Sequence, residues 1–278
     1  MSLSKRLFVC LLLPLFAFGQ KDTISETHSS VLNDRFKAKA GIFVRSRNVA
    51  VRADGSTPNL EIDFDQTFGF NDNETTFFLQ FDWRFSRNKK WMFSGEHFSV
   101  NNASRATLPE DIQFQDVIFE KGSFVRAGVE FALLRAFFSY AFIVKPKHLL
   151  GAGLGSHLFQ IGAFIEGEVR TNQGDLEFER RRVSALLPLP NIGGYYYFSP
   201  HERWAFGARV DWFGLTIDQY SGGLWNIAPN VSFQIFRNFG VGLDYRFFYL
   251  NAKISESNWN GRFLMDFSGP LFTLYGNF

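Results

Sequence analysis

Charged and amide side chains recur at every second position in several segments of this chain. Gln80, Asp82 and Arg84 alternate with large apolar residues, and so do Asp244 and Arg246. Carboxylates and planar guanidinium groups held close together form bidentate ion pairs, or they line a narrow aqueous path. We predict that one enclosed interior gathers Gln80, Asp82, Arg84, Arg126, Glu130, Arg209, Asp211, Asn230, Gln234, Asp244, Arg246, Arg262 and Asp266.

Histidines offer a second kind of chemistry, because an imidazole beside a carboxylate or a hydroxyl can act as a general base in hydrolysis. His97 follows Glu96, and His157 follows Ser156. Adjacent residues of a strand point to opposite faces, so neither pair is oriented by its spacing. We therefore assign no catalytic residue. A hydrolase at the rim of the fold, acting on lipid or peptide, stays an alternative.

Metal, nucleotide and nucleic-acid sites are not expected. No spacing of His, Cys or carboxylate residues resembles a metal-ligand set, and no glycine motif leads into a helix that would hold phosphate. The chain has 29 Lys and Arg against 27 Asp and Glu, a balance that argues against nucleic acid as a partner. No cofactor is predicted.

The elements that must position the polar residues are strands, because apolar and polar side chains alternate with a period of two. From Phe77 to Phe85, and again from Phe239 to Tyr249, one face is apolar. The other faces carry Asn, Gln, Gly, Asp and Arg rather than the exposed Lys and Glu of a soluble sheet. Long strands with an apolar outer face and a polar interior are typical of membrane barrels. We predict an all-β fold, a transmembrane antiparallel up-and-down β-barrel, with a secreted β-sandwich as the alternative.

Short and long connections alternate along the chain, as they do between the two ends of a bacterial barrel. Longer polar segments occupy 54–72, 103–121 and 170–182. The strands are expected near 36–53, 73–86, 90–102, 122–143, 148–169, 183–198, 203–217, 222–236, 239–254 and 258–278. That makes about ten, although a strand within Leu60 to Phe70, or other merging and splitting, would give eight or twelve.

The first residues have the layout of a secretory signal peptide. Lys5 and Arg6 precede the apolar run Leu7 to Phe18, which is too short to span a membrane as a helix. We predict a signal peptide at 1–19, an N-terminal periplasmic segment at 20–35 and the barrel at 36–278. Aromatic residues make up 18% of the chain, yet the mean hydropathy is only −0.09, as expected when apolar and polar side chains are interleaved.

The chain ends on a strand whose last residue is aromatic. Phe272, Leu274 and Phe278 resemble the insertion signal read by the barrel assembly machinery, although Gly276 stands where a bulky residue is usual. The apolar parity differs between 263–267 and 270–274, which predicts a β-bulge near Ser268 and Gly269.

The signal peptide, the alternating strands, the terminal Phe and two short stretches, 209–213 and 244–246, together resemble a family of uncharacterised bacterial outer-membrane β-barrel proteins. The resemblance covers about 59–278 and implies architecture and outer-membrane location in a Gram-negative-type bacterium. It brings no activity with it.

The predicted function is that of a barrel with a side-chain-filled polar interior and a structural or surface-interaction role. A narrow channel for small solutes is the alternative to it. The expected partners are outer-membrane lipids, and Arg180, Arg181 and Arg182 are candidates for contact with lipopolysaccharide phosphates. The alternative for this arginine run is pairing with the nearby Glu177 and Glu179.

Overall fold

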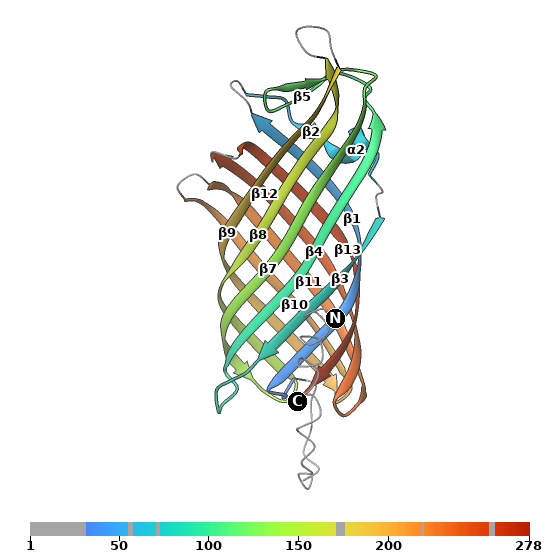
Figure 1. The fold of residues 1–278 in the computed structure, drawn as a ribbon. Helices are drawn as coiled ribbons and strands as arrows, with labels where there is room; N and C mark the ends of the chain where they lie inside the picture. Colours follow the sequence, from blue (N-terminus) through green and yellow to red (C-terminus); the bar gives the residue numbers. More distant parts are fainter. Residues whose placement is uncertain (1–31, 55–57, 71–72, 171–175, 218–219, 256–258) are drawn as a thin grey trace, which may run out of the picture.

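Long antiparallel strands close into a single ring (Figure 1). The computed structural model describes residues 32–54, 58–70, 73–170, 176–217 and 220–278. The ten long strands are β1 (Phe36–Asp54), β3 (Asn73–Trp83), β4 (Trp91–Thr107), β7 (Phe124–Val144), β8 (His148–Arg170), β9 (Leu176–His201), β10 (Trp204–Ile217), β11 (Tyr220–Phe236), β12 (Phe239–Ser255) and β13 (Asn260–Asn277). Each pairs with its neighbours in sequence order, and β13 pairs with β1 to complete the ring. The predicted up-and-down barrel of ten strands is confirmed.

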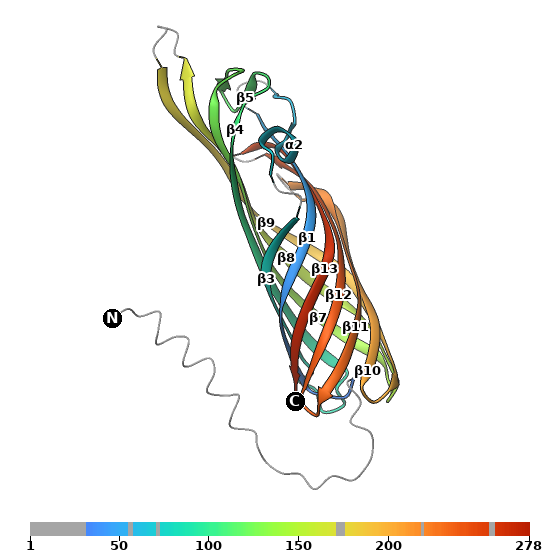
Figure 2. The ribbon, with the colours of Figure 1, turned by 90° about the vertical axis from the view of Figure 1, so that its right-hand side faces the viewer.

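The two ends of the barrel differ. Short turns join β3 to β4, β7 to β8, β9 to β10 and β11 to β12, and the C-terminus lies at this end. The opposite, long-loop end carries β2 (Ile62–Asp63), the helix α2 (Phe64–Phe68), and the hairpin of β5 (Ile112–Phe114) and β6 (Val117–Phe119). Figure 2 shows β8 and β9 extending beyond the other strands at that end. The segment 60–70 is therefore not an additional barrel strand.

The outer surface carries a broad apolar belt on the short-turn half. Side chains such as Phe77, Leu134, Trp225 and Leu243 point outward and are exposed. Phe272 and Leu274 belong to this belt, with exposed fractions of 55% and 69%. On this half of the barrel the inward faces carry the polar residues, as predicted.

The polarity of the two faces inverts on the long-loop half. There the inward side chains are apolar, and Val49, Phe131 and Met265 are fully buried. The outward positions carry Asp266 and Glu130, among other polar residues. Four residues predicted to line the interior, namely Arg126, Glu130, Arg262 and Asp266, lie on the outward face instead, so that part of the prediction is wrong.

The predicted bulge near Ser268 and Gly269 is also wrong. The register of β12 with β13 is continuous from Phe239↔Gly276 to Ser255↔Asn260. The apparent change of parity arises because Phe263, Met265 and Phe267 point inward into the apolar half of the lumen, while the residues at 272 and 274 point outward on the belt. One strand crosses from one environment to the other without a change of register.

Aromatic side chains fill the lumen at mid-height. Phe43, Phe98, Phe131, Phe159, Phe248 and Phe267 contact one another with ring centroids 4.4–6.3 Å apart. The residual cavity between this cluster and the polar layer beneath it is about 10 Å³, roughly the space of one water. At this level the aromatic cluster therefore packs closely on the polar side chains beneath it.

The long-loop elements cover the apolar half of the lumen. Asp63 caps α2 by accepting a hydrogen bond of 2.9 Å from the backbone N–H of Gln66, and the helix buries Phe64 and Phe68. Phe114 of the β5–β6 hairpin is also fully buried. We infer that α2 and the β5–β6 hairpin are held over the lumen by burial of their aromatic side chains. Such burial stabilises by about 25 cal/mol for each Å² removed from water.

Candidate functional site

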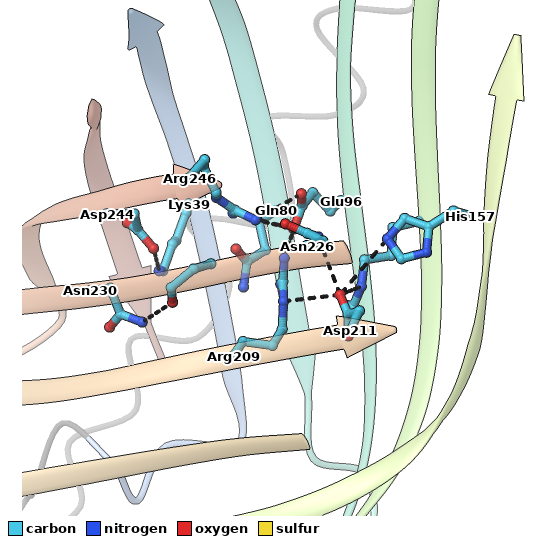
Figure 3. A network of polar contacts seen from close by, with 12 residues as sticks. Lys39, Gln80, Glu96, His157, Arg209, Asp211, Asn226, Asn230, Asp244 and Arg246 are labelled. Atoms are coloured by element: carbon cyan, nitrogen blue, oxygen red, sulfur yellow. Dashed lines mark hydrogen bonds and ion pairs between the residues drawn. The ribbon is translucent and has the colours of Figure 1, made fainter. Parts of the chain in front are cut away.

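Two carboxylates in the polar interior of the short-turn half hold three arginines. Figure 3 labels Glu96 and Asp211 with two of these arginines, Arg209 and Arg246. The Arg135 guanidinium donates two hydrogen bonds of 2.8 Å to the carboxylate oxygens of Asp211. Arg209 donates to Glu96 at 2.7 Å and lies 3.4 Å from Asp211. Arg246 donates to Glu96 at 3.1 Å. All five side chains are buried. We call these five residues the central network.

The central network ties opposite walls of the barrel together. Glu96 comes from β4, whereas its partners Arg209 and Arg246 come from β10 and β12, which are several strands away in either direction around the ring. Arg135 of β7 reaches Asp211 of β10 in the same manner. A buried charge without a partner is expensive, so each member holds the others in place.

A second pair lies nearer the short-turn end. Lys39 Nζ is 3.3 Å from Asp244 Oδ1, and both side chains are buried. Gln80 donates a hydrogen bond of 3.0 Å to Asp82. Nine predicted residues do point inward on this half: Gln80, Asp82, Arg84, Arg209, Asp211, Asn230, Gln234, Asp244 and Arg246.

The predicted interior set leaves out Arg135, Glu96, Lys39 and Asn226. Arg135 is the one charged residue in the apolar run Phe131 to Val144, and that isolated charge was the available signal. Glu96 and Lys39 gave weaker signals, because neither stands in a clear run of alternating apolar and polar residues. Asn226 joins them by donating to Asp211 at 3.2 Å.

The two candidate histidines lie apart from the long-loop rim. His97 points outward, and its Nδ1 is 2.9 Å from the carbonyl oxygen of Leu133. His157 is fully buried, with Nε2 3.8 Å from Asp211, and its ring stacks on Phe159. Glu96 faces the lumen and is held by arginines, so it does not orient His97.

The predicted arginine run forms a paired patch on the outer face of β7, β8 and β9, beyond the belt. Glu166 accepts from Arg126 at 2.8 Å and lies 3.1 Å from Arg180. Arg182 pairs with Glu130. The ring of Phe164 lies beneath Arg126 and Arg180.

A glycine on the neighbouring strand makes room for the aromatic ring of this patch. Gly128 leaves space for the Phe164 ring, because a Cβ there would stand 2.3 Å from a ring atom. Arg181 points to the opposite face and pairs with Glu179. Of the three predicted arginines, two therefore share the outward surface, each with a glutamate partner.

No metal site stands out in the part of the chain that the structure describes, where no group of three or more His, Cys, Asp or Glu residues is placed to hold an ion. Among the same residues, no helix is long and apolar enough to cross a membrane.

Comparison with known proteins identifies the class through structure alone. No family model and no curated protein matches the chain. The outer membrane protease OmpT from Escherichia coli aligns with a TM-score of 0.54 at 11% identity, covering 91% of this chain and 99% of that one. The fold is therefore that of the bacterial outer-membrane β-barrel proteins. The predicted likeness to an uncharacterised family of small barrels stays a prediction.

Two other solved barrels align less well. The P. putida toluene transporter TodX gives a TM-score of 0.39 at 7% identity, covering 88% of this chain and 90% of that one. Ail, the attachment invasion locus protein of Yersinia pestis, gives 0.32 at 10% identity, covering 87% and 98%. At these values neither likeness supports an argument about function.

Proposed function

We propose that this protein is an outer-membrane barrel closed to solutes, whose long-loop end is a surface for interaction outside the cell. The observation that carries the proposal is the inversion of polarity along the strands. An apolar outward face suits lipid, and a polar outward face over an apolar interior suits water. The barrel would therefore stand in the membrane on its short-turn half and project from it on the other.

The orientation follows from the connections. Bacterial barrels place short turns in the periplasm and longer loops outside. The extended parts of β8 and β9, α2 and the β5–β6 hairpin would then all be extracellular. A signal peptide at 1–19, which lies outside the described residues, would direct the chain to this location.

A filled lumen argues against the channel alternative. The central network and the aromatic cluster above it lie in series along the axis, so a solute would have to displace both. We expect no steady conductance from the purified protein in a planar lipid bilayer, with a channel-forming porin as the positive control. Stable single-channel openings that scale with salt concentration would contradict the closed lumen.

The rim hydrolase remains the weaker alternative. OmpT is a protease by its name, but a likeness at 11% identity shows architecture alone. His97 points outward within the belt, between Leu79 and Leu134 of the neighbouring strands, and His157 is buried at the centre, so neither histidine is placed at the rim. Lipid A analysis of cells with the wild-type protein, His97→Ala and His157→Ala tests this alternative. An altered lipid A that disappears in one variant would restore it.

Lipopolysaccharide is the partner that suits the outward arginine patch. Arg126, Arg180 and Arg182 would lie just above the lipid on the extracellular side, where phosphate groups of lipopolysaccharide reside, and guanidinium groups bind phosphate bidentately. Glutamate partners hold these side chains in place but also reduce the net charge. We expect Arg180→Gln to bind purified lipopolysaccharide severalfold more weakly than wild type. Arg203→Gln, at the short-turn end, is the matched control, and equal binding by both variants would refute the contact.

A further inference from the structure

A short strap crosses the mouth of the barrel at the short-turn end. Leu32 is buried against Met92 and Leu149, and its carbonyl oxygen accepts a hydrogen bond from Arg84. The backbone N–H groups of Arg35 and the following Phe donate to the carbonyl oxygen of Phe278, at 2.7 Å and 2.9 Å. Residues 32–35 are thereby fixed across the opening instead of extending away from it.

A cavity of about 50 Å³ lies between this strap and the barrel wall. On the same measure a water needs roughly 10–15 Å³, so the space takes a few waters or one small ion. Its charged lining residues are Asp34, Arg35, Lys37, Lys39, Asp82 and Arg84. Four cations against two carboxylates give the cavity an excess of positive charge.

The carboxylates nearby are already engaged. Asp34 accepts a hydrogen bond from the side chain of Asn277, and Asp82 accepts from Gln80. Lys39 pairs with Asp244, which does not line the cavity. Counting that pair as neutral still leaves the cavity with more cations than carboxylates.

Lys37 is a cation of this cavity that has no ion pair in the described part of the chain. Its Nζ lies 4.1 Å from the centre of the Tyr275 ring, and the described residues place no carboxylate oxygen within ion-pair distance of it. Asp82 stands opposite Lys37 in the register of β1 with β3 but makes no ion pair with it, so this half-buried ammonium is less well stabilised than one in an ion pair. An anion in the cavity would supply the missing partner.

We propose that this mouth binds a small oxyanion of the size of inorganic phosphate, held by Lys37 and Arg84 beside the Lys39–Asp244 pair. Lysine provides point charges and arginine a planar fork, both of which suit phosphate oxygens. Arg35 is exposed, and Lys37 and Arg84 are half-buried, so the cavity opens toward the short-turn side. A bound oxyanion would link the strap to the wall and tighten closure of this end. This site is independent of the surface role proposed above.

Isothermal titration with inorganic phosphate, in a neutral detergent and at constant ionic strength set by chloride, tests the proposal. We expect saturable binding of one phosphate per barrel by the wild-type protein. Lys37→Met keeps a chain over the Tyr275 ring but removes the charge, and should weaken binding at least tenfold. Arg87→Met, in an exposed turn at the same end, is the matched control and should bind as wild type does.

A second variant makes the cavity more positive by removing a carboxylate and leaves every cation in place. Asp82→Asn keeps an acceptor for Gln80 and raises the net positive charge, so phosphate should bind severalfold more tightly. Heat-modifiable gel mobility confirms that each variant is folded. Absence of saturable phosphate binding by the wild type would overturn the proposal, and so would equal affinities in Lys37→Met and Arg87→Met.

Discussion

Replacement of Arg135 by Met is the most informative single change to the central network. Asp211 would lose two hydrogen bonds of 2.8 Å while remaining buried. Breaking a buried pair by removing one partner destabilises by about 3–5 kcal/mol, because the remaining charge is uncompensated. Arg209 at 3.4 Å and Asn226 at 3.2 Å still face that carboxylate, so we expect the lower part of that range, about 3 kcal/mol.

The assay is reversible urea unfolding from lipid vesicles, followed by tryptophan fluorescence. Arg126→Met is the matched control, since it breaks an ion pair with Glu166 whose arginine is 41% exposed, and pairs of that kind contribute at most about 1 kcal/mol. The double variant Arg135→Met with Asp211→Asn removes both charges. It should recover most of the free energy of unfolding that Arg135→Met loses. If Arg135→Met lowers the free energy of unfolding by no more than Arg126→Met does, the reasoning is refuted.

Three further predictions concern other parts of the barrel. Burial raises the pKa of Asp34 above its usual 3.8 despite the Asn277 hydrogen bond, so its contribution to stability is greatest below about 3.8 and is lost as pH rises through the raised value. Asp34→Asn should therefore raise the unfolding temperature at neutral pH in phosphate-free buffer, and the gain should vanish in acid. Leu243→Arg on the belt should lower the free energy of unfolding by about 2–4 kcal/mol, the cost of an arginine near the bilayer midplane. Ser184→Arg, on the outward face beyond the belt, should change the free energy of unfolding little in the same assay. Phe114→Ala in the β5–β6 hairpin should lower the free energy of unfolding by about 3–5 kcal/mol and speed protease cleavage of that hairpin. Unchanged stability and cleavage would show that the hairpin is not packed as described.

The architecture could be predicted because alternation reports which residues share a face of a strand. The ten strands and their up-and-down order followed from that pattern and from the alternating lengths of the connections. Alternation does not report which face is inside. The pattern predicts Arg126, Glu130, Arg262 and Asp266 in the lumen only if polar residues point inward along whole strands. The strands instead continue into a region where the outward face is the polar one.

Part of the site depended on contacts across the lumen, which a local pattern does not contain. The pairing of Glu96 with Arg209 and Arg246 joins residues more than a hundred positions apart. Arg135 shows that an isolated charge within an apolar run is a useful signal of a buried partner. The strap over the short-turn mouth had no such signal, because its backbone makes most of its contacts.

The central claim is that one outward face meets lipid on the short-turn half and water beyond it. Single cysteines at Leu243 and Glu130, each carrying an environment-sensitive fluorophore in vesicles, test it directly. Lipid-borne quenchers should act at position 243 and aqueous iodide at position 130. Equal quenching of positions 243 and 130 by lipid, or of both by iodide, would contradict the account.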